Sequence, residues 1–473
     1  MPKRVIVIGG GITGLSAAHR LSELGRDKNL NLEITLLERS DRLGGVISTV
    51  ERHGFTIEEG PDSFITSKPW GLNLSSRLGL ESELIETNRE KRRTYILIGG
   101  KLVTLPEGFF MLAPTRIMPF LRTPLFTWRG KARMLMDLVL PKNPRPDESL
   151  TSFVTRRLGR EALERAAQPM ISGIYTADPD RLSLRATMPQ ILEMEERYGS
   201  VIKGMYQSYR SRKKSAGVES GARYSLFVSY RNGMKTLVEA LVKKIPDGSI
   251  KTGVPVDGIK EAYDGWEVTT GEGILNADGV VVTTPAYLTA GLLENAAGEC
   301  AALLREIEYA SSAVVILAYN KGDIDAALDG LGFVVPRLEN SSMIACSFSS
   351  EKFPGRAPEG YTYLRVFVGG AVRPDMYRME DARIIEAVEG ELSRLLRIKS
   401  DPVFTIIKRY PEAMPQYHVG HGELVERIQR EIKKLDGVEV AGNAFGGVGI
   451  PDCINSGERA AERLLQSLYS GNI

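Results

Sequence analysis

The chain has 473 residues, of which 42% are hydrophobic and 25% charged, so it has the composition of an ordinary globular protein with two or three domains. Its 61 lysines and arginines balance 59 acids, and the net charge of +2 excludes a general electrostatic attraction to nucleic acid. Three widely separated cysteines suit reduced thiols in the cytosol, four histidines supply a metal site poorly, and no apolar run reaches the ~18 residues of a transmembrane helix.

The stretch VIVIGGGITGLSAAHRL, residues 5–21, predicts a strand, a glycine-rich turn and an amphipathic helix. Within it, Gly9, Gly11 and Gly14 fit the pattern G-x-G-x-x-G. The first glycine permits a tight turn, the second lets a pyrophosphate approach the backbone, and the third allows the helix to pack on the strand. Free N–H groups at the helix start would hold the phosphates, so the stretch predicts a dinucleotide-binding turn. Because the strand begins almost at once, we expect no signal or transit peptide.

The first helix is expected to end near Leu24, with Gly25 as its stop. A second strand, LEITLLE, then ends at Glu38, where a carboxylate can take both hydroxyls of an adenosine ribose. A glycine pair, Gly44 and Gly45, follows, at which a second loop could pass close to the cofactor. This spacing favours dinucleotide binding over a merely structural turn.

A basic and apolar segment occupies residues 89–133, with ten lysines or arginines against two acids and many interleaved aromatic and aliphatic residues. One interpretation is a helical insertion whose apolar residues are core and whose charges face water. The other is a surface that docks on anionic lipid or receives a flat, negatively charged substrate. The sequence leaves both open. The later basic run Arg210–Lys214 predicts a solvated, mobile loop rather than a nucleic-acid arm.

The C-terminal stretch VEVAGNAFGGVGIPDCINSGERAAERLL predicts a strand that ends at Gly442, a glycine loop and a helix that starts near Pro451. The N-terminus of such a helix, aimed at a ring oxygen, would stabilise the negative charge that a reduced isoalloxazine acquires. Just before it, His418 and His421 have a spacing that could ligate a metal, but beside two glycines they predict two surface imidazoles, and we expect no metal site.

The two ends of the chain together resemble the FAD-containing amine oxidase superfamily, in which the first and last segments form one FAD domain. The resemblance implies FAD as the cofactor and Val254, at the end of an edge strand, as a backbone contact of the adenine. Tyr410 stands where the family commonly has tryptophan and implies an approximate flavin-side aromatic contact. The remaining residues implied to contact FAD are Gly9, Gly10, Gly11, Ile12, Thr13, Gly14, Glu38, Arg39, Arg42, Gly44, Gly45, Gly60, Pro61, Asp62, Ser63, Gly442, Gly449, Ile450 and Pro451.

Within this superfamily, the central chain resembles the porphyrinogen oxidases of haem synthesis. The resemblance rests on RRLGREALERAAQPMISGIYTADPDRLSL, EEGPDSF, SYRNGMKTLVEAL and YPEAMPQYHVGH, with Ala177 where the family typically has glycine. It implies removal of six electrons from coproporphyrinogen III to give coproporphyrin III, with oxygen reduced to hydrogen peroxide; protoporphyrinogen IX is the alternative substrate. No catalytic side chain can be assigned, because the flavin itself accepts hydride. Lys68, just past the Gly60–Ser63 turn, is the candidate that binds a substrate carboxylate, and the alternative is an ordinary solvated lysine.

The resemblance implies an α/β architecture with a discontinuous, Rossmann-like FAD-binding domain, a mixed α+β substrate domain and a helical insertion. We expect the FAD domain at residues 1–66, 222–295 and 425–473, the substrate domain at 67–95 and 296–424, and the insertion at 96–221. The expected location is the cytoplasm, with peripheral contact at the inner face of the cell membrane and a transient contact with the next haem-pathway enzyme as further expectations. An amine oxidase, a carotenoid desaturase and a non-enzymatic escort protein stay open as alternatives.

Overall fold

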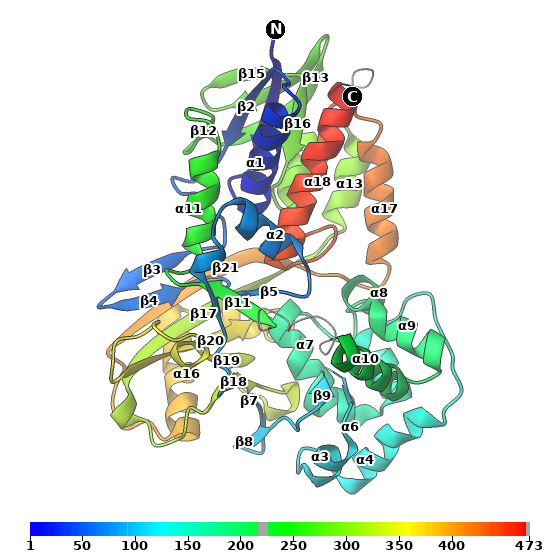
Figure 1. Cartoon of the computed structure of the whole chain (residues 1–473), viewed down its shortest axis with the longest axis vertical. Helices are drawn as coiled ribbons and strands as arrows, with labels where there is room; N and C mark the ends of the chain where they lie inside the picture. The colour runs from blue at the N-terminus through cyan, green and yellow to red at the C-terminus, as the bar shows by residue number, and fades with distance from the viewer. Residues whose placement is uncertain (92, 111, 216–225, 470–473) are drawn as a thin grey trace.

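The structure is a computed structural model that describes residues 1–91, 93–110, 112–215 and 226–469. Three units make up the fold (Figure 1). A nucleotide-binding unit forms one half, and a sheet unit and a helical unit lie side by side in the other half. Among the described residues, no helix combines the length and the apolar content needed to cross a membrane.

The nucleotide-binding unit is built on a parallel sheet with strand order β12-β2-β1-β16-β22. Its strands are β1 (Lys3–Ile8), β2 (Leu32–Leu37), β12 (Ile250–Lys251), β16 (Gly279–Val282) and β22 (Val438–Val440). In β1 the side chains of Val5 and Val7 enter one hydrophobic core, and those of Ile6 and Ile8 enter another. Both faces of the sheet are therefore covered, which explains why residues 5–8 of β1 are all apolar and buried rather than alternating.

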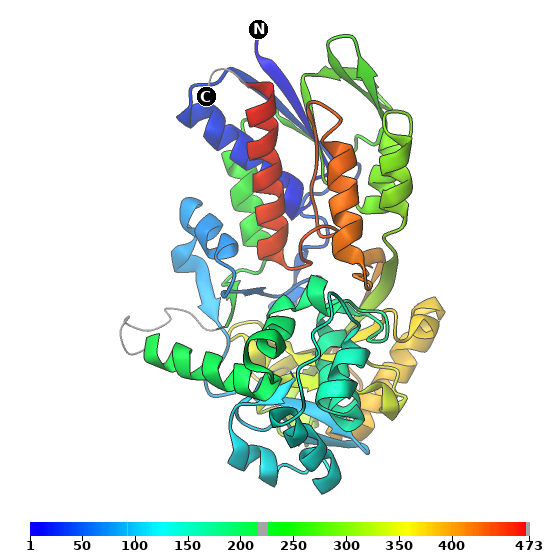
Figure 2. The ribbon, with the colours of Figure 1, turned by 90° about the vertical axis from the view of Figure 1, so that its right-hand side faces the viewer.

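Helices cover one face of this sheet, and helices with a small antiparallel sheet cover the other. The first face carries α1 (Ile12–Asp27), α2 (Trp70–Arg77), α11 (Lys235–Lys244) and α18 (Ile450–Leu468). The second carries α12 (Ala286–Leu293), α13 (Gly298–Arg305), α17 (His421–Ile432), β13 (Val256–Ala262), β14 (Gly265–Thr270) and β15 (Gly273–Ala277). The helices α1 and α18, from opposite ends of the chain, lie side by side in both views (Figures 1 and 2).

The sheet unit contains seven strands in the order β21-β17-β20-β19-β18-β7-β8. They are β7 (Arg93–Ile98), β8 (Lys101–Thr104), β17 (Tyr309–Asn320), β18 (Gly330–Val334), β19 (Ala345–Phe348), β20 (Tyr361–Gly369) and β21 (Phe404–Pro415). The long amphipathic helix α16 (Asp381–Leu396) packs its buried face on this sheet, and two short helices, α14 (Ser349–Lys352) and α15 (Pro374–Arg378), lie beside it. Smaller strand pairings link this unit to the nucleotide-binding unit: β3 (Thr49–Arg52), β4 (Phe55–Glu58), β5 (Phe64–Ile65), β6 (Leu84–Glu86) and β11 (Phe227–Tyr230).

The helical unit has its own hydrophobic core, centred on residues such as Phe120, Phe153 and Met205. Its elements are β9 (Phe109–Phe110), β10 (Ala113–Pro114), α3 (Ile117–Arg122), α4 (Trp128–Leu135), α5 (Leu150–Arg157), α6 (Arg160–Ala162), α7 (Gln168–Tyr175), α8 (Leu184–Thr187), α9 (Pro189–Tyr198) and α10 (Val201–Ser215). A π-helical turn at Leu163–Ala167 joins α6 to α7. The apolar residues of the basic segment thus serve mainly as core, as its first interpretation predicted.

The expected unit boundaries differ from the structure at four places. The boundary between residues 95 and 96 falls inside β7, because β7 and β8 pair with the distant strand β18 and stay in the sheet unit. The helix α2 shares the core of the nucleotide-binding unit, so that unit extends beyond residue 66. The helix α13 does the same beyond residue 295, and α17 already begins at His421.

Two local predictions were also wrong. The first helix does not stop at Gly25 but continues to Asp27, and Asn29 takes the left-handed conformation that ends the segment (φ 52°). The basic run Arg210–Lys214 is helical as part of α10 rather than a loop, because lysine and arginine extend a helix readily. The sequence SAGVESG that follows the helix, and was predicted to be mobile with it, lies mostly outside the described residues.

Candidate active site

The three glycines of the turn after β1 have different surroundings. Gly9 has φ of 107°, and a Cβ added there would lie 2.7 Å from Thr283 Oγ1. A Cβ on Gly14 would overlap the carbonyl oxygen of Gly9, so α1 starts as close to β1 as a backbone can. A Cβ on Gly11, by contrast, meets no atom within 4 Å. The protein itself needs the first and third glycines, and the second faces open space at the N-terminus of α1.

Glu38 follows β2 and is held firmly at the same sheet edge. Its Oε2 accepts a hydrogen bond from the Gly10 N–H at 2.6 Å, and its Oε1 accepts from the Ser40 N–H and hydroxyl, both at 2.8 Å. A carboxylate has about four acceptor positions, so it keeps capacity for a ribose hydroxyl. The Val254 N–H donates to the Glu38 carbonyl at 2.9 Å, which places Val254 beside it. Because the N–H of Val254 is already used, its carbonyl is the backbone group that could form a hydrogen bond with an adenine.

The loop that contains Gly44 and Gly45 lies directly on the glycine turn. Both glycines have positive φ, 102° and 59°, and a Cβ on Gly45 would be 3.2 Å from the Gly11 Cα. Arg42 donates to the carbonyls of Gly45 and Ile47, the latter at 3.1 Å, and so holds the loop in place from within. The loop therefore brings a second stretch of backbone to the glycine turn, and Arg42 holds it there. The contacts of Gly44, Gly45 and Arg42 with FAD stay predictions.

Buried charges surround the turn at residues 60–63. Asp62 accepts hydrogen bonds from Lys352 Nζ at 2.8 and 3.0 Å and lies 3.2 Å from Arg365 Nη1. Burial alone would raise the pKa of Asp62, but Lys352 and Arg365 hold it well below its usual range. Arg365 Nη2 also donates to the Gly60 carbonyl. Two cations from the sheet unit therefore anchor the turn, which no local motif of the sequence indicated.

Two polar groups beside this turn are buried and lack hydrogen-bond partners among the described residues: Arg365 Nε and the Tyr410 hydroxyl. The hydroxyl would lie 3.5 Å from a Cβ placed on Gly60. Burial raises the pKa of Tyr410 to about 12, so it keeps its proton. A buried donor without a partner costs about 1–3 kcal/mol. Together with the open space above Gly11, these donors fit a polar cofactor that extends from α1 to the sheet unit, as FAD would.

The second helix that reaches this region is α18. It starts at Ile450 with Pro451 in its first turn, as predicted. A Cβ on Gly457 would overlap the carbonyl of Thr13, so α18 and α1 pack backbone against backbone. Gly442 is tied to the same helix, because its N–H donates to Ser456 Oγ at 3.0 Å. The N-terminus of α1 therefore packs against α18 at Gly457, the eighth residue of that helix, and the first turn of each helix has N–H groups that can face negative charge.

An aromatic pair supports the loop before α18. The Tyr417 hydroxyl donates to the Asn443 carbonyl, and the His421 ring stacks on Tyr417 with centroids 4.1 Å apart. His421 Nε2 lies 2.9 Å from the Ala444 carbonyl oxygen. The prediction of two surface imidazoles is wrong for His421, which is buried because it braces this loop; His418 is half-buried. Burial lowers the pKa of His421 to about 4, so the ring is neutral near pH 7.

Lys68 is neither isolated nor simply solvated. Its Nζ lies 2.6 and 2.7 Å from the two carboxylate oxygens of Asp452, in the first turn of α18. Its side chain is 43% exposed, and that of Asp452 only 8%. Asp452 stands inside the GIPDC stretch that the sequence had singled out for its glycine and proline, and its acidity was the signal that went unused. A role of Lys68 toward a substrate stays a prediction.

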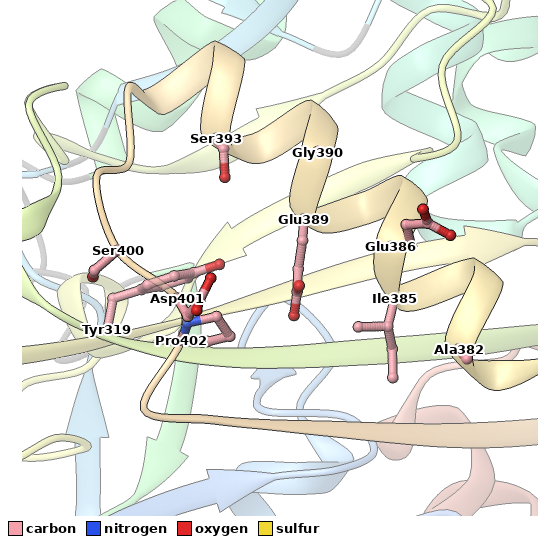
Figure 3. Close-up of a pocket in the computed structure, with 10 residues that line it drawn as sticks. All are labelled: Tyr319, Ala382, Ile385, Glu386, Glu389, Gly390, Ser393, Ser400, Asp401 and Pro402. Atoms are coloured by element: carbon pink, nitrogen blue, oxygen red, sulfur yellow. The ribbon is translucent and has the colours of Figure 1, made fainter.

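A hollow of about 560 Å³ lies between α16 and residues 400–402, over Tyr319 of β17 (Figure 3). The residues that line it include Glu386, Glu389 and Asp401 but neither lysine nor arginine. Carboxylates would repel an anionic substrate, so this hollow suits no such molecule. Among the described residues there is also no group of three or more histidines, cysteines or acids that could hold a metal ion.

The profile of flavin-containing amine oxidoreductases matches residues 12–465. The chain belongs to this family. It is therefore an FAD-dependent oxidoreductase, and the predicted cofactor and fold class are confirmed. The open space above Gly11, at the N-terminus of α1, agrees with this cofactor. For the individual FAD contacts, Arg39 included, the assignment stays a prediction.

Curated relatives match along the whole length. A coproporphyrinogen III oxidase from Bacillus subtilis is 37% identical and one from Staphylococcus aureus 35%, each over 99% of this chain and at least 99% of the relative. The chloroplastic protoporphyrinogen oxidase 1 of Arabidopsis thaliana is 30% identical over 96% of this chain and 87% of its own. A crystal structure from Exiguobacterium, provisionally named protoporphyrinogen oxidase, superposes with a TM-score of 0.85 at 31% identity, covering 98% of this chain and 99% of that one.

Proposed function

We propose that the chain oxidises coproporphyrinogen III to coproporphyrin III in haem biosynthesis, with oxygen as the final acceptor. The observation that carries this proposal is the full-length similarity to three bacterial proteins named coproporphyrinogen III oxidase, at 37%, 35% and 32% identity. Plant relatives named protoporphyrinogen oxidase follow at 30% and below, so protoporphyrinogen IX is the second candidate substrate.

The reaction removes six hydrogens and six electrons in three two-electron steps. Each step reduces one oxygen molecule to hydrogen peroxide, so three oxygen molecules balance one porphyrinogen. FAD, when bound, supplies the hydride acceptor that oxygen can reoxidise. The gain in aromaticity drives the oxidation, and the protein therefore needs mainly to position the macrocycle and the ring. This agrees with a site that offers helix N-termini and buried donors rather than a nucleophile and base.

Each part of the site has a role in this proposal. The N–H groups of α1 above Gly11 bind the pyrophosphate, and Glu38 binds the adenosine ribose. The N-terminus of α18 and the unpartnered donors of Arg365 and Tyr410 face the ring end of the cofactor. Lys68, with its partly exposed ammonium, binds a propionate of the substrate. Coproporphyrinogen has four such carboxylates and protoporphyrinogen two, and a buried carboxylate without a cation is costly.

Mixing the purified protein anaerobically with each porphyrinogen tests the proposal. The protein should be yellow, and coproporphyrinogen III should bleach its flavin absorbance, which oxygen then restores with formation of peroxide. We expect a higher kcat/KM for coproporphyrinogen III than for protoporphyrinogen IX. A clear preference for the second substrate would make the chain a protoporphyrinogen oxidase, and bleaching by an amine or a polyene alone would favour the other enzyme classes. A folded but colourless protein would favour an escort protein.

We further propose a cytoplasmic enzyme that touches anionic membrane surfaces through its helical unit. Large apolar side chains are exposed there: Ile117, Met118 and Trp128 (71%) lie within the basic segment 89–133, and Val139 (80%) follows shortly after it. Apolar side chains and cations together favour the surface of an anionic bilayer. Co-sedimentation with vesicles containing phosphatidylglycerol should exceed that with neutral vesicles and fall with salt. A transient contact with the next haem-pathway enzyme stays a prediction.

A further inference from the structure

Asp452 is the buried acidic residue of the candidate active site that faces a single lysine. It is the third residue of α18 and is 8% exposed, whereas the Lys68 side chain is 43% exposed. A Cβ on Gly447 would overlap the Asp452 carboxylate, and one on Gly449 would lie 3.0 Å from its Oδ2. The glycine loop therefore packs tightly around the carboxylate. In this pair the aspartate is fixed by its surroundings, and the lysine is the member that can move.

A count of hydrogen-bond donors shows what the pair leaves free. A lysine ammonium has three N–H donors and no acceptor. The two oxygens of Asp452 lie 2.6 and 2.7 Å from Lys68 Nζ, on one side of the ammonium, so they engage at most two of its three donors. At least one donor is left for another partner, and the side chain that carries it is 43% exposed. Lys68 can thus bind another carboxylate without giving up Asp452, and Asp452 fixes the direction in which that carboxylate must approach.

The pair lies where the nucleotide-binding and helical units meet. Val448, just before α18, packs against the core of the helical unit, and Tyr417 belongs to that core. Burial and the Asp452 charge raise the pKa of Tyr175, at the end of α7, to about 12. Next to it, Ile174 is 47% exposed although Ile171 on the same helix is buried. Tyr175 and the exposed Ile174 of the helical unit therefore lie near the Lys68–Asp452 pair and supply both polar and apolar groups there.

The pair also changes the charge at the N-terminus of α18. A lone carboxylate in the first turn would place a negative charge beside N–H groups that are otherwise available to an anionic ring. Lys68 neutralises this charge at hydrogen-bond distance. Removal of the lysine would leave a carboxylate that is 8% exposed and without its cation, which is costly in a partly buried site.

We infer that Asp452 is a positioning residue for substrate binding: it holds the Lys68 ammonium so that its third N–H faces a substrate propionate. This inference rests on the proposed function, because it needs a substrate that carries carboxylates. It assigns Asp452 no contact with the substrate. Its effect should therefore appear in KM, act through Lys68, and disappear for a ligand without carboxylates.

The test compares Asp452→Asn, Asp452→Glu, Lys68→Met and the double variant Lys68→Met/Asp452→Asn. Asp325→Asn serves as the matched control, because Asp325 lies 2.6 Å from Lys399 Nζ in an exposed pair of the sheet unit. Asp452→Asn should keep its FAD and raise KM for coproporphyrinogen III about tenfold with kcat within about twofold, as expected for weaker uniform binding. Asp452→Glu should restore most of the affinity. In the Lys68→Met background, Asp452→Asn should change KM no further, and Asp325→Asn should match the wild type.

Equilibrium binding gives a readout without turnover. Quenching of protein fluorescence should show about tenfold weaker binding of coproporphyrin III to Asp452→Asn and to Lys68→Met. The tetramethyl ester, in dilute detergent, should bind the wild type and both variants equally. An unchanged or lower KM in Asp452→Asn, or an equal loss of ester binding, overturns the inference. If Asp452→Asn loses its flavin, the Lys68→Met variant tests the inference instead. If Lys68→Met binds coproporphyrin III as tightly as the wild type does, the inference is overturned.

The two proposals fail in different ways. If the wild-type protein is yellow but neither oxidises a porphyrinogen nor binds coproporphyrin III, the proposed function is wrong. If the wild type turns over coproporphyrinogen III but the Asp452 variants show no more effect than the Asp325 control, the proposed function stands and the positioning role is wrong.

Discussion

Two alanine substitutions in one turn separate cofactor binding from folding. At Gly11 an added Cβ meets no protein atom within 4 Å, and the backbone (φ −72°, ψ 177°) suits any residue. At Gly14 the Cβ would overlap the Gly9 carbonyl and lie 2.8 Å from Thr283 Oγ1. We expect Gly14→Ala to destabilise the fold by about 1–3 kcal/mol, the usual effect of overpacking. Gly11→Ala should stabilise the flavin-free protein slightly, by ~0.4–1 kcal/mol, because alanine has less freedom when unfolded.

Although Gly11→Ala should not destabilise the fold, it should weaken the binding of FAD. The new methyl group would stand where the pyrophosphate approaches the N-terminus of α1, and it would move the phosphates away from N–H donors. Each hydrogen bond to a charged group that is lost removes about 1.5–3 kcal/mol. The Kd for FAD should therefore rise roughly ten- to a hundredfold for one lost bond.

Thermal melting of the flavin-free and the FAD-saturated protein measures both effects at once. Gly11→Ala should leave the melting temperature of the flavin-free protein nearly unchanged and shrink the rise that FAD causes. Gly14→Ala should lower the melting temperature even without FAD. Full flavin retention by Gly11→Ala after dialysis, or normal melting of Gly14→Ala, would refute the assignment of the second glycine to the ligand and the third to the fold.

The chain ends were predictable because their signals are local. A strand, a glycine turn and a helix occupy adjacent residues, and the spacing of apolar residues or a proline predicts each element. Unit boundaries were not local. The strand β7 pairs with β18, more than 200 residues later in the chain. The hydrophobic pattern of a strand does not indicate which distant strand it pairs with. The β7–β8 hairpin did carry a local signal, which was not used: a Gly-Gly pair stands between two short strands, and in the structure Gly99 and Gly100 have positive φ of 57° and 73°, as such a two-residue turn requires.

The supporting side chains of the site show the same limit. Glu38 was found because it ends a strand at a fixed distance from the glycine turn. Arg365 and Lys352 lie 305 and 290 residues from the residues they hold, and Tyr417 lies 26 residues from Asn443. Each stands in a stretch that resembles an ordinary strand, helix or loop. Asp452 was inside a recognised stretch, but a carboxylate at a helix start also reads as a favourable first-turn acid, and only the fold brings Lys68 to it.

Three further substitutions test other parts of the structure. Glu38→Ala should weaken FAD binding by about 1.5–3 kcal/mol, measured as flavin lost on dialysis, and unchanged retention would make Glu38 purely structural. Arg157→Met should lower the free energy of unfolding by about 3–5 kcal/mol, because it leaves the fully buried Asp137 unpaired, whereas Arg383→Met in an exposed pair should change it by less than ~0.5 kcal/mol in urea unfolding. His421 tests the pH dependence of stability. Its pKa is about 4 when folded against 6.5 when unfolded, so the unfolded chain binds the proton first as the pH falls. Its contribution should be complete above pH 6.5 and be lost progressively toward pH 4, by about 3 kcal/mol in all. His421→Gln should remove this part of the slope, and an identical pH profile in the variant would show that the ring is not held neutral by burial.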